Sequence, residues 1–139
     1  MPRPIRFEIQ AGEPLRAVAF YTAVFGWEFT RLRGSMPYWL IKTGPATEPG
    51  IDGGLHPRVG PPPEPDQAVT AFLCTVDVPS LDAAVALVNR HGGAILSSKI
   101  PVPAVGWLAY ARDTEGNVLG LMEADPTVQE PPTRNYPEP

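Results

Sequence analysis

Apolar and polar residues alternate at the start of the chain, where residues 5–10 read IRFEIQ. In an extended segment the apolar residues of this stretch share one face, and Arg6, Glu8 and Gln10 share the other. The pattern predicts a β-strand with an apolar face for a core and a charged face for solvent or a ligand.

The period then changes to that of a helix. Residues 12–25 carry a broad apolar stripe at helical spacing, formed by Leu15, Val18, Ala19, Tyr21, Val24 and Phe25. Pro14 suits the first helical turn and Gly26 suits the C-terminal cap. Two strands are predicted next, at residues 27–32 and 36–44, and a short one near residues 51–55. A Gly- and Pro-rich stretch surrounds the short strand.

The same order of elements begins again after a proline-rich linker. Residues 70–78 are strand-like, residues 79–93 helical, and residues 94–102, 106–111 and 118–123 strand-like again. At an offset of 66 residues Leu15 aligns with Leu81 and Gly26 with Gly92. The sequence therefore predicts two βαβββ modules in one domain, residues 1–125. Module 1 covers about 4–57, the linker 58–68 and module 2 about 69–125. The Pro-rich residues 126–139 are expected to form a tail, either disordered or lying on a surface.

The turn in the second module allows its last two strands to be paired residue by residue. Residues 113–117, DTEGN, predict a tight turn with Gly116 in the left-handed conformation. Tyr110 then lies opposite Gly120, and Leu108 opposite Met122. Cross-strand partners share a face, so one face is expected to carry Leu108, Tyr110, Arg112, Val118, Gly120 and Met122. The helix-facing side is expected to carry Ala109, Ala111, Leu119 and Leu121.

Composition limits the classes of binding partner and the cellular compartment that we expect for this protein. The formal net charge is −4 and the pI about 5.1, which argues against nucleic acid and anionic membranes as the main partner. Cys74 is the single cysteine, so no intrachain disulfide is expected, and its apolar surroundings predict a buried, inert thiol. No apolar stretch reaches the length of about 18 residues that a membrane span needs. Arg3 and Arg6 are not followed by a signal-peptide-like apolar run. We therefore expect a soluble, cytoplasmic protein.

Four stretches together resemble the vicinal oxygen chelate superfamily, which includes glyoxalase I, bleomycin-resistance proteins and extradiol dioxygenases. They read RAVAFYTAVFGWEF, GIDGGL, TVDVPSLDAAVALVNRHGG and ARDTEGNVLGLME. The resemblance implies an α+β fold in which two βαβββ modules form a half-open mixed barrel with the helices outside and a cleft on the concave side. Such proteins commonly dimerise to complete the cleft, so a homodimer is expected.

The resemblance also implies where a metal ion would bind. Enzymes of the superfamily place one ligand on the first and one on the last strand of each module. Those positions fall on Arg6, near Gly53 or Gly54, on Ala71 and on Gly120. Arginine has no lone pair to offer, and the other three positions carry no donor side chain. We therefore expect neither the family's metal site nor another cofactor.

Eight residues are the candidates for a ligand site: Arg6, Glu8, Trp39, His56, Leu108, Tyr110, Gly120 and Met122. Each also has a structural interpretation. Arg6 and Glu8 either anchor a ligand or pair with other charges, and Tyr110 either forms an aromatic floor or covers Gly120. Trp39 belongs to the core or to a pocket wall, and His56 is a rim residue or a catalytic one. Glu8 is the one, weak candidate for a general base.

Three functions remain open on these grounds. The first, which the sequence favours, is binding of a small apolar or aromatic molecule in the cleft without chemistry. The second is a glyoxalase-type lyase or isomerase that works without a metal, or with an unusual one, through Glu8, Arg6 or Tyr110. The third is a non-catalytic interaction subunit whose proline-rich tail contacts a partner.

Overall fold

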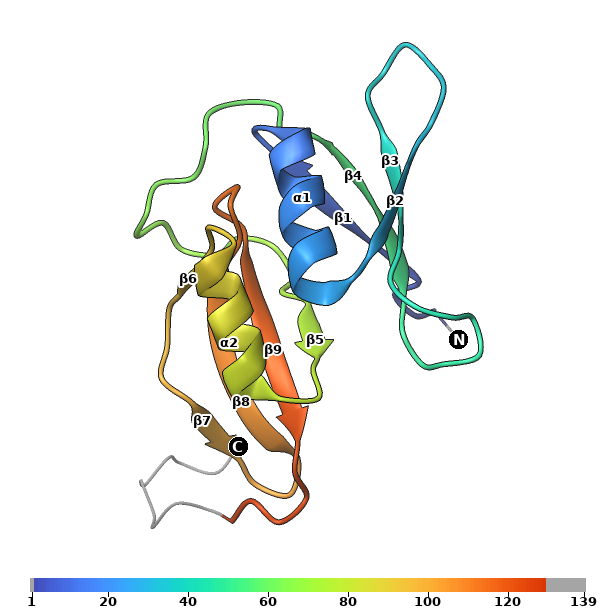
Figure 1. Cartoon of the computed structure of the whole chain (residues 1–139). Helices are drawn as coiled ribbons and strands as arrows, with labels where there is room; N and C mark the ends of the chain where they lie inside the picture. The colour runs from blue at the N-terminus through green and yellow to red at the C-terminus, as the bar shows by residue number, and fades with distance from the viewer. Residues whose placement is uncertain (1, 130–139) are drawn as a thin grey trace.

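The computed structural model describes residues 2–129, and it shows the predicted element order twice (Figure 1). The first module contains β1 (Arg6–Ala11), α1 (Pro14–Phe25), β2 (Glu28–Arg31), β3 (Trp39–Lys42) and β4 (Asp52–Pro57). The second contains β5 (Thr75–Asp77), α2 (Leu81–Arg90), β6 (Ala94–Ile95), β7 (Ile100–Val102), β8 (Gly106–Arg112) and β9 (Val118–Ala124). The α+β class and the two modules are thereby confirmed.

Each module forms its own mixed sheet. In the first, the strand order is β1-β4-β3-β2, with β1 and β4 parallel. In the second, the order is β5-β9-β8-β6, and β7 also pairs with β8, so that two short strands share the place of β2. The sheets of four and five strands are not closed into a barrel.

Local sequence explains where the helices begin and end. Pro14 occupies the first turn of α1, and Gly26 ends that helix in the left-handed conformation with φ 73°. Ser80 caps α2, because its hydroxyl accepts a hydrogen bond from the backbone N–H of Ala83. Neither helix in residues 2–129 is long and apolar enough to cross a lipid bilayer.

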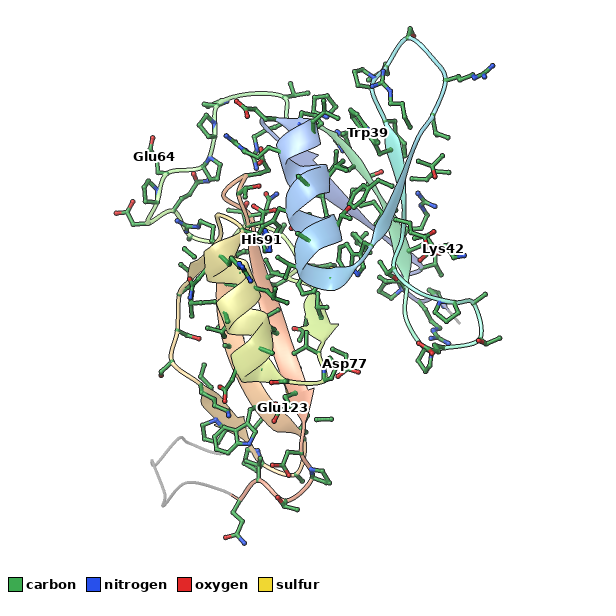
Figure 2. All side chains as sticks on the ribbon, in the orientation of Figure 1. Trp39, Lys42, Glu64, Asp77, His91 and Glu123 are labelled. Atoms are coloured by element: carbon green, nitrogen blue, oxygen red, sulfur yellow. The ribbon has the colours of Figure 1, made fainter. Side chains whose placement is uncertain are left out.

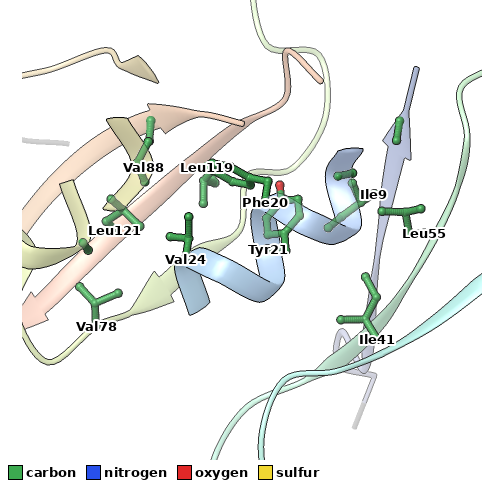
Figure 3. Packing of buried hydrophobic residues seen from close by; sticks show 14 of the residues in the cluster. Ile9, Phe20, Tyr21, Val24, Ile41, Leu55, Val78, Val88, Leu119 and Leu121 are labelled. Atoms are coloured by element: carbon green, nitrogen blue, oxygen red, sulfur yellow. The ribbon is translucent and has the colours of Figure 1, made fainter. Parts of the chain in front are cut away.

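One hydrophobic core joins the two modules. It contains Ile9, Ala11 and Leu55 from the first sheet, Leu119 and Leu121 from the second, and residues of both helices. Helix α1 lies between the two sheets in this core (Figure 3). Each sheet packs one face against the helices in this common core. The other face of each sheet points away from the core, so the two modules present two separate surfaces. We call these the outer face of module 1 and the outer face of module 2.

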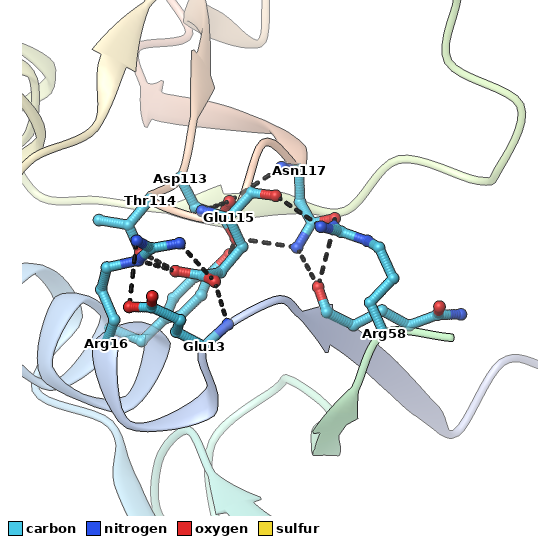
Figure 4. Close-up of polar contacts among 9 residues, drawn as sticks. Glu13, Arg16, Arg58, Asp113, Thr114, Glu115 and Asn117 are labelled. Atoms are coloured by element: carbon cyan, nitrogen blue, oxygen red, sulfur yellow. Dashed lines mark hydrogen bonds and ion pairs between the residues drawn. The ribbon is translucent and has the colours of Figure 1, made fainter. Parts of the chain in front are cut away.

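The β8–β9 turn fastens the second module to the first through a set of hydrogen bonds that we call the clasp (Figure 4). Glu115 accepts hydrogen bonds from the Glu13 backbone N–H at 2.8 Å and from Arg16 Nε at 2.7 Å. Arg58 donates to the Glu115 carbonyl at 2.9 Å and to Asn117 Oδ1 at 2.9 Å. Asn117 Nδ2 donates in turn to the Gln10 carbonyl, and Tyr21 donates to Asp113. The clasp consists of Gln10, Glu13, Arg16, Tyr21, Arg58, Asp113, Glu115 and Asn117.

The clasp carboxylates have different proton affinities. Burial raises the pKa of Asp113, although hydrogen bonds from Tyr21, Asn117 and the Glu115 backbone counteract part of that rise. Burial also acts to raise the pKa of Glu115. In that case hydrogen bonds from Arg16, the Glu13 backbone and Thr114 outweigh it, and the pKa is lowered. Glu115 is therefore held as a carboxylate beside Arg16.

Two local predictions were wrong. The strand expected over residues 70–78 is only Thr75–Asp77, and the apolar residues before it are solvent-accessible, with Phe72 fully exposed. Cys74 is consequently exposed rather than buried. A strand needs backbone partners as well as a suitable sequence, and of residues 70–78 only 75–77 are in register with β9.

Part of the expected tail packs on the second module. The Ala104 backbone N–H donates to the Val128 carbonyl at 3.0 Å, and the Val128 side chain is buried. Residues 126–129 thus lie on a surface. The remaining residues of the predicted tail, 130–139, lie outside the described part of the chain.

Candidate functional site

The outer face of module 1 gathers a polar group of four side chains. Arg6 and Glu8 come from β1, His56 from β4, and Tyr38 from the residue before β3. Glu8 Oε2 lies 3.3 Å from His56 Nε2, and the Tyr38 hydroxyl donates to Glu8 Oε1 at 3.5 Å. Arg6 Nη2 donates to the Tyr38 hydroxyl at 3.3 Å. We call Arg6, Glu8, Tyr38 and His56 the polar quartet.

Strand alternation accounts for this arrangement. Ile9 and Ala11 enter the core, so the even-numbered residues of β1 point to the outer face. In the parallel β1–β4 pair Glu8 lies opposite Gly54, and His56 follows two residues later on the same face. The predicted site residues Arg6, Glu8 and His56 are thus brought together: Arg6 and Glu8 hydrogen-bond to Tyr38, and His56 contacts Glu8.

Tyr38 was missed by the sequence interpretation, although a signal for it exists. The ring of Tyr38 occupies the space in which a side chain at Gly54 would stand. It also lies parallel to the His56 imidazole, with ring centroids 6.2 Å apart. A pair of glycines inside a strand indicates close approach by another group, and Gly53–Gly54 is such a pair.

The quartet is accessible to solvent. The Glu8 side chain is 58% exposed and that of His56 is 26% exposed. Next to it an open depression of about 260 Å³ lies over the same sheet, lined by Arg6, Glu28, Thr30, Leu40, Lys42, Asp52 and neighbouring backbone. The surface offers donors, an acceptor and an imidazole, but the single chain does not enclose it.

Trp39 does not belong to this surface. It lies on β3, where Figure 2 labels it, and is buried on the core side opposite Leu55. The Arg31 guanidinium lies 4.7 Å from its ring centroid. Adjacent residues of a strand point to opposite faces, so the Trp39 side chain and its neighbour Leu40 are separated by the sheet. The core interpretation of Trp39 is confirmed, and its side chain lies on the opposite side of the sheet from the polar quartet.

The outer face of module 2 has the predicted register. Tyr110 pairs with Gly120, Leu108 with Met122 and Arg112 with Val118. Ala109, Ala111, Leu119 and Leu121 are buried in the core, as expected for the opposite side. Leu108, Tyr110, Val118 and Met122 are half-buried, so this face presents a mainly apolar surface.

Gly120 makes room for a neighbour on the other side from Tyr110. A Cβ atom at Gly120 would lie 2.6 Å from Thr75 Oγ1, and the three nearest atoms all belong to Thr75. The glycine therefore permits close approach of β5, and Tyr110 is not what fills that space. The Tyr110 ring is left as part of the apolar surface.

The residues at the family's metal-ligand positions do not fit a metal ion. The Arg6 guanidinium donates to Tyr38 and to the Gly53 carbonyl, Tyr38 stands over Gly54, and Thr75 stands over Gly120. Ala71 lies in the exposed segment before β5. Across residues 2–129 no three His, Cys, Asp or Glu side chains converge as a ligand set. The residues present supply neither the donors nor the space for the metal that the resemblance implies.

Comparisons with known proteins agree with the fold. Residues 3–121 match the family model described as glyoxalase/bleomycin resistance protein/dioxygenase superfamily. A glyoxylase-like domain-containing protein from Didymella fabae is 34% identical over 119 residues, which cover 82% of this chain and 88% of that protein. A crystal structure of a family enzyme from Burkholderia phytofirmans PsJN has 17% identity and a TM-score of 0.64, covering 86% of this chain and 96% of its own. The fosfomycin resistance protein FosX from Listeria monocytogenes has 10% identity and a TM-score of 0.66, covering 89% and 92%.

Proposed function

Because the chain belongs to the glyoxalase/bleomycin resistance protein/dioxygenase superfamily, we propose that it binds a small apolar or aromatic molecule without the metal ion of the family's enzymes. The observation that carries this proposal is the replacement at the metal positions. Hydroxyl-bearing side chains, Tyr38 and Thr75, fill the space over Gly54 and Gly120. With the metal positions filled by side chains, the outer faces of the two sheets are the surfaces left for binding a small molecule.

The outer face of module 2 supplies the binding surface. Leu108, Tyr110, Val118 and Met122 present apolar and aromatic atoms on neighbouring strands. Burying apolar area stabilises a complex by roughly 25 cal/mol per Å², and an aromatic side chain adds a preference for ring stacking. A flat, apolar compound suits this surface better than a polar one.

A second copy of the chain completes the site. Each outer face is open in the single chain, and β1 and β5 are both edge strands whose outer backbone groups have no strand partner within residues 2–129. The apolar residues Val69 and Phe72 next to β5 are exposed. A homodimer that covers these residues encloses a ligand between the apolar face of one copy and the polar quartet of the other.

The test is equilibrium binding of phenylnaphthylamine, a neutral aromatic fluorophore whose emission rises in apolar sites. We expect saturable binding at one or fewer molecules per chain, weakened in Met122→Gln, which removes apolar surface from the outer face of module 2. Leu15→Gln is the matched control, because Leu15 is exposed on α1. Absence of saturable binding, or equal weakening in both variants, would contradict the proposal.

A second candidate function is metal-independent acid–base chemistry at the polar quartet. The 3.3 Å approach of Glu8 to His56 favours it, because a carboxylate that orients an imidazole is a common general-base arrangement. Glu8→Gln would then abolish turnover of any substrate found for the protein. An unchanged rate in that variant would remove this candidate.

A further inference from the structure

The Arg112 side chain is half-buried on the outer face of module 2, and its Nε–H is a buried donor without an acceptor in residues 2–129. Buried donors in proteins are nearly always paired, and a guanidinium group favours a carboxylate or another planar oxyanion. An acceptor beyond those supplied by residues 2–129 would satisfy this donor.

The nearest carboxylates in the sequence are already saturated. Asp113 Oδ1 accepts from the Glu115 and Asn117 backbone N–H groups, and Asp113 Oδ2 accepts from Tyr21. Both oxygens of Glu115 are held by Arg16, Thr114 and the Glu13 backbone. Because residues alternate along β8, Arg112 points to the outer face of module 2, whereas the clasp pulls Asp113 to the buried side.

Arg112 lies at one end of the apolar surface already described. It pairs with Val118, and the next pair on the same face is Tyr110 with Gly120, followed by Leu108 with Met122. Successive residues on one face of a strand are about 7 Å apart. An aromatic ring lying over Tyr110 and Met122 can therefore carry an acidic substituent that reaches the Arg112 guanidinium.

We infer that the small molecule bound by the outer face of module 2 is an organic anion, an aromatic body with one carboxylate-like or sulfonate-like group held by Arg112. This inference rests on the proposed ligand-binding function and specifies the class of its ligand. Thr75 Oγ1 and the Tyr110 hydroxyl border the same face and offer further hydrogen-bonding groups.

Two fluorophores with the same aromatic framework test the inference. Anilinonaphthalene sulfonate carries an anionic group, and phenylnaphthylamine lacks it. For the unmodified protein we expect tighter binding of the sulfonate. In Arg112→Gln we expect its dissociation constant to rise about tenfold, as for loss of a hydrogen bond to a charged group, while that of phenylnaphthylamine changes less than twofold. Arg112→Lys is expected to retain part of the preference, since it keeps the charge but not the planar fork.

Arg90→Gln is the matched control, because it removes the same charge from the exposed end of α2. Binding of phenylnaphthylamine to Arg112→Gln shows that the variant's binding surface is intact, so a folding defect is not mistaken for loss of the anion contact. An unchanged ratio of the two affinities in Arg112→Gln overturns the inference and leaves the proposed function standing. Dissociation of a dimer in Arg112→Gln would also overturn the inference and leave the proposed function standing. It would mean that the acceptor for Arg112 is a carboxylate of the second copy rather than the ligand. Failure of both fluorophores to bind the unmodified protein overturns the proposed function and the inference with it.

Discussion

The Tyr21 hydroxyl donates a 2.6 Å hydrogen bond to Asp113 Oδ2, and this bond joins α1 of the first module to the β8–β9 turn of the second. Both groups are buried. Tyr21→Phe leaves the carboxylate with one donor fewer, so we expect the free energy of unfolding to fall by about 1–3 kcal/mol. Urea denaturation of both proteins at neutral pH measures this change in the free energy of unfolding. Tyr110→Phe is the control, since within residues 2–129 the Tyr110 hydroxyl makes no hydrogen bond, and an equal loss there would contradict the assignment.

Acid should weaken the clasp through Glu115. Its pKa is lowered in the folded state, so its stabilisation is present above the ordinary value of about 4.5 and is lost as the pH falls through the lowered value. The raised pKa of Asp113 has the opposite effect: its protonation as the pH falls favours the folded state and offsets part of that loss. We expect Glu115→Gln to be less stable than the unmodified protein by about 2 kcal/mol at neutral pH. The difference should shrink below pH 4.5, as urea denaturation across a pH series would show.

A difference that stays constant down to pH 2 would contradict this account, because it would mean that the charge of Glu115 is irrelevant. Glu64→Gln is a suitable control, since Glu64 is exposed in the linker. It should leave stability unchanged across the same range.

Gly120 and Thr75 should behave as a coupled pair. A methyl group at position 120 would meet Thr75 Oγ1 at 2.6 Å, so we expect Gly120→Ala to cost about 1–3 kcal/mol of stability. Thr75→Ala removes the colliding atom, and the double variant should recover much of that loss in a double-mutant cycle. Gly44→Ala is the control, because no atom lies within 4 Å of the corresponding position there. Strict additivity of the two substitutions would show that they do not meet.

Metal binding is a direct test of the fit at the family's ligand positions. We expect calorimetric titration with nickel, zinc or manganese to show no binding near one ion per chain, because Arg6, Gly54, Ala71 and Gly120 offer no donor side chain. Stoichiometric binding that disappears in Glu8→Gln or His56→Gln would contradict this prediction and place a metal at the polar quartet.

The register of β8 and β9 could be predicted because its determinants are local. Gly116 has φ 85°, the left-handed turn conformation inferred from DTEGN, and the alternation on either side then fixes which residues are buried. The start and end of α1 follow equally from Pro14 and Gly26.

Tyr38 and Arg112 show what the sequence could not supply. Tyr38 joins Glu8 and His56 only because three separate strands meet in one sheet, and the glycine that admits it lies on another strand. The isolation of Arg112 depends on where the carboxylates of Asp113 and Glu115 point, which the clasp decides. Likewise, residues 70–73 have the composition of a strand, but the pairing with β9 begins only at the Cys74 carbonyl, which accepts from the Gly120 N–H.

The clasp also determines how late in synthesis the two modules can be joined, because it needs residues from both ends of the described chain. Its bonds join residues that are far apart in the sequence, with separations of 107 residues for Gln10 and Asn117 and 102 for Glu13 and Glu115. Contacts between distant residues form late in folding, because the entropy cost of closing a long loop comes before the stabilisation by the contact. We therefore expect the face of α1 that receives the β8–β9 turn to stay exposed to solvent until that hairpin has left the ribosome.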